Sequence, residues 1–258
     1  MISVFANEAQ NLELKLYKFN YSNLSGNLLE YKGVNIQKAF RQDSNNNEIV
    51  FNKRVSCEIT YSTEYSQEVL SCFLMNDQSL FLVINFNPEN VSPISFSNNQ
   101  IKTTGNNMIV SAVSPDKKKC IVCFIDFATN FYCSLYDSET NELSEPVIFM
   151  TKCMQLEYGA DIQYISEKKE YIGYCLLGNS RKNIIKLNEN FEVKESENNS
   201  KYYISVSAQG GQCYNVYSMS VLYIKSSQDY FIARTCDIEN VPKLDLVSTT
   251  NRRKYSKI

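Results

Sequence analysis

The chain has 258 residues, of which 43% are hydrophobic and 21% are charged, and its net charge is −2. These values are typical of a folded globular protein and exclude a disordered chain. The near-neutral balance gives no general attraction to nucleic acid or to an anionic membrane, so neither is expected as a partner. No run of about 18 apolar residues occurs, so no membrane-spanning helix is expected.

Tyr and Phe are plentiful in the chain, with 18 and 14 residues, while Ala is scarce. β-Branched and aromatic residues fit the half-buried surface of a sheet, and chains poor in Ala seldom build long helices. Asn and Ser are abundant and favour turns through local side-chain hydrogen bonds. The composition therefore predicts an all-β protein. It also resembles proteins of AT-rich protist genomes, a similarity of codon usage that says nothing about chemistry.

The N-terminal part of the chain predicts three short strands. Residues 12–19 alternate apolar and polar side chains, which is typical of a strand with one buried face. Residues 2–6 form a candidate partner strand, and a turn at 25–27 leads to a third run at 28–31. Residues 43–48 include three consecutive Asn and predict an exposed loop.

Four further groups of strands follow, separated by turn residues. The second and third groups comprise 55–61, 69–74, 80–86 and 91–96, then 108–113, 120–126, 131–137 and 143–149. The fourth and fifth comprise 162–165, 170–177, 183–187 and 191–194, then 219–225, 229–236 and 243–247, before a basic tail at 252–254. Pro88 and Pro93 favour a sheet edge for the strand 91–96, because proline cannot donate to a strand ladder.

The second strands of three groups align on their cysteines. Cys72, Cys123 and Cys175 are spaced 51 and 52 residues apart, and we expect them to occupy equivalent places in successive sheets. Self-similarity at such a period indicates a repeat architecture. Four antiparallel strands per unit resemble the blade of a β-propeller, and residues 136–147 resemble the turn between the third and fourth strands of such a blade. There is no Trp, so no Trp-Asp signature is present.

The resemblance implies an all-β, β-propeller-like array of about five four-stranded antiparallel blades. Residues 1–258 then form one unit, with approximate blades at 1–50, 51–100, 101–150, 151–205 and 206–258. The first group lacks its inner strand and the last lacks its outer strand. Either the two ends complete one blade together, or the chain is part of a longer ring. A plain antiparallel sandwich is the remaining alternative.

The nine cysteines allow several interpretations. Cys120 and Cys123 have the spacing of a metal or redox pair, but residues three apart on a strand point to opposite faces. Without His or a second such pair, no metal site is predicted. The cysteines are either small buried apolar residues or members of disulfides. Two candidate pairs, Cys57 with Cys72 and Cys120 with Cys133, lie symmetrically about hairpin turns.

The absence of His removes the usual general base and the common nucleophile–His arrangements. Catalysis by a carboxylate pair stays open, with the candidates Asp126, Asp137, Glu157, Asp161 and Glu170. Most of them lie beside turn residues, where a solvated carboxylate is the default. An arginine cluster would need Arg41, Arg54, Arg181 and Arg234 to converge. Lys117–Lys118–Lys119 and Lys168–Lys169 precede corresponding strands and are expected on one rim, where they keep turns soluble.

The sequence therefore shows no catalytic, cofactor-binding or metal-ligating constellation. We expect a non-catalytic propeller that serves as a binding or assembly module for protein partners, at the cell surface or in a larger assembly. The alternative is a carbohydrate-active hydrolase with a carboxylate pair in the central channel. The N-terminus lacks the features of a signal peptide, so the chain is cytosolic, a mature product or an excised piece. The cysteine number and the hairpin-symmetric pairs favour an exported location.

Overall fold

The computed structural model describes thirteen stretches of the chain: residues 5–6, 12–18, 29–35, 55–75, 80–86, 91–97, 108–126, 128–153, 160–177, 181–196, 213–226, 229–238 and 241–248. All regular structure in these stretches is β-strand, and none of them contains a helix that could cross a membrane. The all-β class is confirmed.

The strands form five antiparallel sheets in chain order. The first sheet contains β1 (Phe5–Ala6), β2 (Leu12–Lys18) and β3 (Leu29–Asn35). The second contains β4 (Ser56–Ser62), β5 (Gln67–Met75), β6 (Leu80–Phe86) and β7 (Val91–Ser97). The third contains β8 (Ile109–Val113), β9 (Lys119–Ile125), β10 (Phe131–Asp137), β11 (Glu142–Leu143) and β12 (Val147–Met150). The fourth contains β13 (Ala160–Ile165), β14 (Glu170–Leu177), β15 (Arg181–Asn188) and β16 (Val193–Ser196), and the fifth β17 (Cys213–Ile224), β18 (Asp229–Ile238) and β19 (Val241–Ser248).

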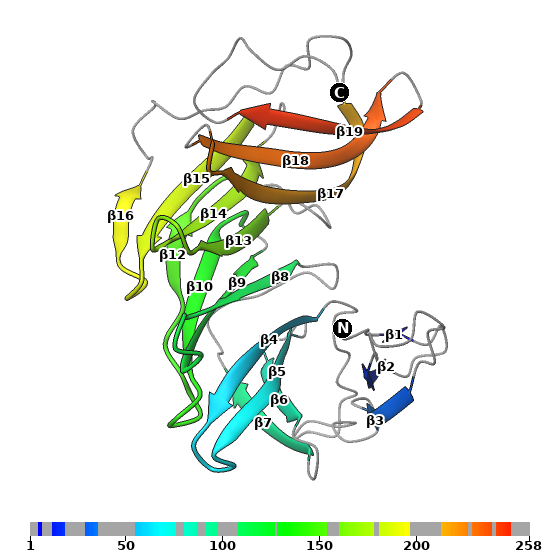
Figure 1. Cartoon of the computed structure of the whole chain (residues 1–258), viewed down its shortest axis with the longest axis vertical. Coiled ribbons are helices and arrows are strands. Elements are labelled where there is room, and N and C mark those ends of the chain that lie inside the picture. Colours follow the sequence, from blue (N-terminus) through cyan, green and yellow to red (C-terminus); the bar gives the residue numbers. More distant parts are fainter. Residues whose placement is uncertain are drawn as a thin grey trace.

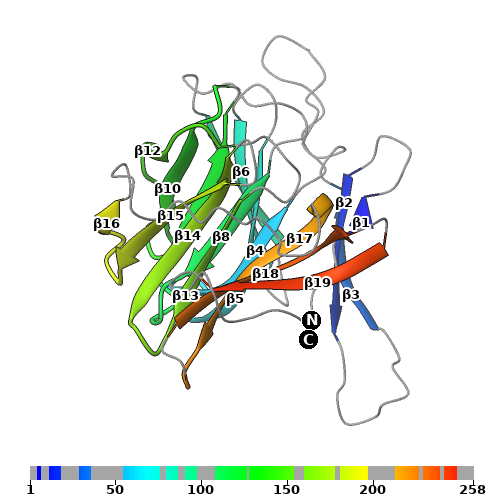
Figure 2. The ribbon, with the colours of Figure 1, turned by 90° about the horizontal axis from the view of Figure 1, so that it is seen from above.

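The five sheets follow one another along an open arc (Figure 1). In the second to fifth sheets the first strand lies on the concave side of the arc and later strands lie progressively outward. The first strands also contact one another, β4 with β8, β8 with β13 and β13 with β17. Both views place the blue first sheet apart from the green and yellow strands of the third and fourth sheets (Figure 2). This radial order is that of a β-propeller and confirms the expected fold.

The third and fourth sheets bury both faces, because each packs between two neighbours. Phe73 and Val83 of the second sheet pack with Val122 and Phe124 of the third. The opposite face of the third sheet, which includes Ile121, packs on the fourth sheet. Burial on both faces explains why β5 and β9 read as nearly continuous apolar runs instead of alternating ones. The blade boundaries stay a prediction, since most connections between sheets lie outside the described residues.

The expected equivalence of the three cysteines is wrong for one of them. Cys123 and Cys175 lie in the same apolar cluster, so Cys123 faces forward to the fourth sheet and Cys175 faces back to the third. Cys72 alternates with Phe73, which faces the third sheet, and therefore also faces back. Cys72 and Cys175 are the sixth residues of β5 and β14, whereas Cys123 is the fifth of β9. This one-residue offset moves the side chain to the other face.

The outer strand expected at 143–149 is divided into β11 and β12, which both pair with β10. Pro146 lies between them and cannot donate to the ladder. The amide of Ser144 still donates to the carbonyl of Leu135. Pro93 lies in the edge strand β7, as expected for proline.

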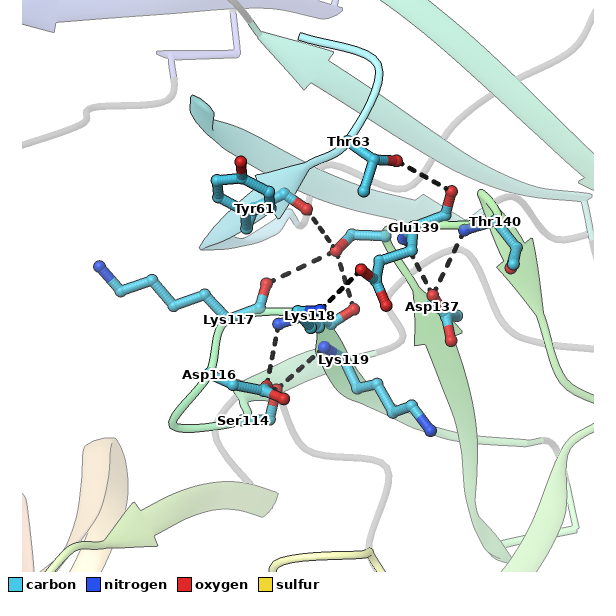
Figure 3. Close-up of polar contacts among 11 residues, drawn as sticks. Tyr61, Thr63, Ser114, Asp116, Lys117, Lys118, Lys119, Asp137, Glu139 and Thr140 are labelled. Carbon is cyan, nitrogen blue, oxygen red and sulfur yellow. Dashed lines mark hydrogen bonds and ion pairs between the residues drawn. The ribbon is translucent and has the colours of Figure 1, made fainter. Parts of the chain in front are cut away.

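The turns at one rim join the second and third sheets (Figure 3). The amide of Tyr61 donates to the carbonyl of Lys117 at 2.7 Å. The buried hydroxyl of Ser138 lies 2.7 Å from the carbonyl oxygen of Tyr61 and 2.8 Å from that of Lys118. Lys118 also pairs with Glu139 at 2.7 Å. These contacts, called the rim cluster below, fix how two neighbouring blades meet.

Candidate functional site

A polar cluster lies on the first strands of the second and third sheets. Glu58 of β4 points toward β8, where the hydroxyl of Ser111 donates to its Oε1 at 3.1 Å. Ser111 Oγ also lies 2.7 Å from Ser56 Oγ. Glu58 is half-buried, so part of its carboxyl group stays accessible. An acidic side chain thus lies where the first strands of two blades meet, and the first strands lie on the concave side of the arc.

Asp161 occupies the corresponding position of the fourth sheet. Glu58 lies opposite Ser71, the fifth residue of β5. Asp161 lies opposite Tyr174, the fifth residue of β14. Asp161 Oδ1 accepts from the amide of Ile162 at 2.9 Å, and Oδ2 from the side-chain amide of Gln163 at 2.9 Å. Both carboxyl oxygens are therefore held by the chain's own uncharged donors.

Tyr174 lies across from Asp161 in the register of β13 and β14. Its side chain is fully buried, and its hydroxyl has no hydrogen-bond partner among the residues that the structure describes. Burial and the nearby charge of Asp161 raise the pKa of Tyr174 far above its usual value. A buried hydroxyl without a partner is costly and rare in folded proteins. We refer to Glu58, Ser111, Asp161, Gln163 and Tyr174 together as the concave cluster. Glu58 and Ser111 lie between the second and third sheets, whereas Tyr174 lies on the face of the fourth sheet that packs with Tyr223 of the fifth.

The two carboxyl groups titrate in sequence. Burial raises the pKa of Asp161 from 3.8 to about 6, although the bonds from Ile162 and Gln163 lower it. Burial also raises the pKa of Glu58 from 4.5 to about 7. The hydrogen bond from Ser111 lowers this pKa, and repulsion from the charge of Asp161 raises it. Asp161 ionises first, while Glu58 is still neutral, so only Glu58 feels the charge of the other group.

The chemistry open to this cluster is narrow. General acid catalysis of glycoside cleavage uses a carboxyl group with a raised pKa together with a second carboxylate nearby. The same groups can bind a ligand through charge and hydrogen bonds. No group of three or more candidate metal ligands occurs in the described stretches.

Among the cysteines whose side chains are described there are three disulfides: Cys57–Cys72, Cys123–Cys133 and Cys153–Cys175. Cys57 lies opposite Cys72 in the register of β4 and β5. The pairing expected between Cys120 and Cys133 is corrected, because Cys123 and not Cys120 lies opposite Cys133 across β9 and β10. Cys120 is a buried free thiol, and its burial raises its pKa well above the usual value.

The other acidic candidates have turn or surface roles. Asp126 accepts from the backbone and side-chain amides of Asn130 at 2.7 and 3.1 Å, which closes a turn. Asp137 accepts from two amides of the turn that follows it (Figure 3). Glu170 lies 3.8 Å from the ammonium of Lys194.

The remaining candidates do not contribute to the cluster as far as the chain is described. Glu157, Arg41 and Arg54 lie outside the described residues, and only the backbone is described at Arg181 and Arg234. Lys117 is paired with Glu68 at 2.6 Å, in keeping with a solvated rim.

The sequence pattern points to Asp161 but not to Glu58, Ser111 or Tyr174. Glu58 is flanked by apolar strand residues, and a charged residue within such a strand is the signal that could have found it. The electrostatic effect of Asp161 on Glu58 has no sequence signal, because it depends on the packing of β8 against both β4 and β13.

No model of a known protein family and no curated protein matches the chain. Solved structures are similar in backbone. The BP39L lectin of Burkholderia pseudomallei has a TM-score of 0.57 at 7% identity, over 93% of this chain and 64% of that protein. AofleA from Arthrobotrys oligospora has a TM-score of 0.52 at 10% identity, over 92% and 66%. The SapL1 lectin, solved in complex with alpha methyl fucoside, has a TM-score of 0.50 at 8% identity, over 96% and 76%.

At these identities the likeness shows the fold alone. The chain spans less than two thirds of the length of the first two structures. The radial sheets and these backbone similarities define a protein of the β-propeller fold class.

Proposed function

We propose that the chain is a non-catalytic β-propeller binding module that takes a partner on its concave face. The observation that carries the proposal is the concave cluster, where the scaffold fixes two half-buried carboxyl groups. Glu58 is bonded by Ser111, and Asp161 is held through both oxygens by Ile162 and Gln163. A ligand with polar groups would bond to the accessible part of these carboxyl groups, and placed polar groups of this kind are the basis of specific recognition.

The fold supports a binding role because it gives a rigid platform. Each described central blade is packed on both faces, and buried hydrogen bonds join neighbouring blades. Sites built on such elements hold their side chains precisely. Two of the similar structures are lectins, which motivates the inclusion of glycans among the ligands tested.

The test is a binding screen with the full chain immobilised. Secreted and cell-surface proteins and a glycan panel are passed over the wild type, the variant Glu58→Gln and the control Glu64→Gln, whose side chain is exposed on a turn. We expect a stable partner whose affinity falls about tenfold in Glu58→Gln, which corresponds to about 1.4 kcal/mol, and is unchanged in Glu64→Gln. Recovery of no stable partner, together with turnover of a substrate, would defeat the proposal.

A second candidate is a carbohydrate-active hydrolase, and the titration of Glu58 and Asp161 favours it. Burial raises the pKa of Glu58 to about 7 and that of Asp161 to about 6, so both carboxyl groups change protonation close to neutral pH, as general acid–base catalysis requires. This alternative predicts hydrolysis of chromogenic aryl glycosides, abolished in Glu58→Gln and retained in Glu64→Gln. Absence of hydrolysis across a broad aryl-glycoside panel would end it.

We also propose that the protein works in an oxidising location, at the cell surface or outside the cell. Three disulfides among the described residues support this, since disulfides persist mainly in such compartments. Thiol counting in denaturant without reductant tests the proposal, and nine reactive thiols would overturn it.

A further inference from the structure

The three described disulfides differ in how deeply they are buried. In the two that involve the third and fourth sheets, every cysteine has an exposed fraction of 3% or less. In Cys57–Cys72 of the second sheet, Cys72 is 1% exposed but Cys57 is only half-buried. Exposed disulfides are reduced more readily than buried ones, because a thiolate has to reach one of the two sulfur atoms. Among the described disulfides, Cys57–Cys72 is therefore the one open to exchange.

The face of β4 that carries Cys57 is accessible beyond the cysteine itself. Ile59 lies two residues further along, on the same face, and is 47% exposed, although the residue opposite it in β5, Leu70, is buried. The other face of β4 meets the third sheet, where Ser111 donates to Glu58. A thiol in solution can therefore approach Cys57 without entering the interface between the second and third sheets.

The reducing thiol has to come from outside the described part of the chain. Cys120 is the free thiol whose side chain is described, and it is buried in an apolar cluster with Phe73, on the opposite face of the second sheet from Cys72. Burial also raises the pKa of Cys120, which keeps the thiol protonated, and the thiolate is the form that attacks a disulfide.

β4 has few contacts besides this disulfide to hold it in place. Of its seven residues only Thr60 and Ser62 are buried, whereas four of the five residues of β8 are buried. β4 is also the first strand of its sheet, and in the described stretches its ladder is formed with β5 alone. Elements with few buried apolar contacts open locally at a low free-energy cost. The covalent bond to β5 therefore contributes a large share of what keeps β4 closed.

We propose that Cys57–Cys72 is a site of thiol–disulfide exchange with a dithiol, and that its reduction loosens β4 from β5. One thiolate of the dithiol attacks the sulfur of Cys57, the disulfide bond breaks, and Cys72 leaves as a thiolate that takes up a proton. The second thiol of the dithiol then attacks the mixed disulfide and releases Cys57. The dithiol is oxidised by two electrons to a disulfide, and the protein gains two thiols.

This inference goes beyond the proposed binding function and does not depend on it. The two are connected through β4, because the strand that reduction loosens also carries Glu58 of the concave cluster. Both experiments that follow are made without a ligand. A failure to find any binding partner therefore refutes the binding function and leaves the exchange site in place, whereas a failure of the experiments below refutes the exchange site alone.

The first experiment measures which disulfide of the folded chain is reduced first. Accessible free thiols are blocked with iodoacetamide at about pH 8, the reagent is removed, and dithiothreitol is added as the dithiol. New thiols are trapped over time with N-ethylmaleimide and assigned to peptides by mass spectrometry. We expect Cys57 and Cys72 to be labelled about tenfold faster than the cysteines of the two buried disulfides. Equal rates for the three disulfides, or earlier labelling of Cys153 and Cys175, would overturn the inference.

The second experiment follows amide hydrogen exchange before and after this selective reduction. We expect exchange in β4 to become about tenfold faster, while exchange in β13 is unchanged. The double variant Cys57→Ser, Cys72→Ser should show the fast β4 exchange without reductant and should not respond to dithiothreitol. Unchanged β4 exchange in the reduced wild type would contradict the loosening of β4. Because both experiments use the wild type, they decide the matter even where the variant fails to fold.

Discussion

Glu58 is held on β4 in an environment that disfavours its charge. Burial is the main cause, and the charge of Asp161 adds to it, so the pKa of Glu58 is about 7 while its usual value is 4.5. Between these two values the folded chain binds a proton that the unfolded chain has lost. The free energy of unfolding therefore contains a favourable contribution that is complete below about pH 4.5 and disappears as the pH rises through about 7. Asp161 adds a similar contribution between its usual value of 3.8 and about 6.

This titration predicts the behaviour of Glu58→Gln. The amide keeps the shape of the side chain but cannot ionise, so the variant should not lose the contribution of Glu58 at high pH. Relative to wild type, its unfolding free energy should rise by about 2 kcal/mol between pH 4.5 and pH 8, a value reduced from the full shift because the group is half-buried. Urea unfolding at the two pH values measures this. Glu64→Gln should follow the wild type, and parallel curves for all three proteins would refute the burial of Glu58.

The sequence indicates Asp161 directly and carries a weaker signal at Glu58, a charged residue between apolar strand residues, but it cannot indicate Tyr174. Asp161 is a candidate because carboxylates are the available acid–base groups in a chain without His. Glu58 and Tyr174 gain their significance only from packing. The missing bond of Tyr174 depends on which atoms surround it, and a single sequence carries no record of that.

Among the elements, the second and third sheets are joined by a buried polar network as well as by apolar packing. Asn85 of β6 accepts from Ser71 at 2.7 Å and donates to the hydroxyl of Tyr136 in β10 at 3.1 Å. Thr60 lies 2.6 Å from Ser71, and Tyr136 donates to Asn141 at 3.0 Å. The chain of bonds crosses from one blade to the next, and its central members are buried.

Removal of the central amide should be costly. Asn85→Ala leaves Ser71 and Tyr136 short of a partner inside the interface, which should lower the unfolding free energy by about 1–3 kcal/mol. Chemical denaturation with the control Asn190→Ala, at an exposed turn position, measures the effect. A loss below about 0.5 kcal/mol, the ordinary effect of a surface change, would show that the network contributes little.

The rim cluster makes a separate prediction about the same pair of sheets. Ser138→Ala removes the buried hydroxyl that lies between the carbonyls of Tyr61 and Lys118, at a cost of about 1 kcal/mol. The backbone bond from Tyr61 to Lys117 should then open more often, so amide exchange at Tyr61 should be faster by about five- to tenfold. Unchanged exchange at Tyr61 in the variant would show that the hydroxyl does not hold the turns together.

The strands are predictable from alternating apolar residues and turn residues, but the face of the sheet that each side chain takes is not. The cysteine spacing suggests one repeating position, yet Cys123 faces forward where Cys72 and Cys175 face back. Side chains alternate between the two faces of a strand, so an offset of one residue changes the face. The pairing of residues across a hairpin likewise depends on the position of the turn to within one residue. The symmetric placement of Cys120 and Cys133 about a turn differs by three residues from the observed register.

For the whole molecule, an arc of sheets is stabilised mainly by contacts between neighbours, as in other repeat arrays. Cys57–Cys72 and Cys123–Cys133 each link neighbouring strands of a single sheet, the second and the third. Cys153, in contrast, follows β12 of the third sheet and is bonded to Cys175 in β14 of the fourth. This bond is therefore a covalent link between blades. It closes a loop with a sequence separation of 22, against 10 for Cys123–Cys133.

Loss of this link should weaken the arc at one defined interface. Cys153→Ser should lower the unfolding free energy by about 3 kcal/mol, as expected for a loop of this length, and should speed amide exchange in β13 and β14 more than in β4 and β5. Cys57→Ser is the matched control, because it opens a disulfide within the second sheet and should speed exchange there instead. Since the three disulfides use six of the nine cysteines, the wild type should also show at most three reactive thiols in denaturant without reductant. If Cys153→Ser changed exchange in β4 and β5 as much as in β13 and β14, the sheets would unfold as one cooperative body and the view of the arc as a row of separately stabilised interfaces would be wrong.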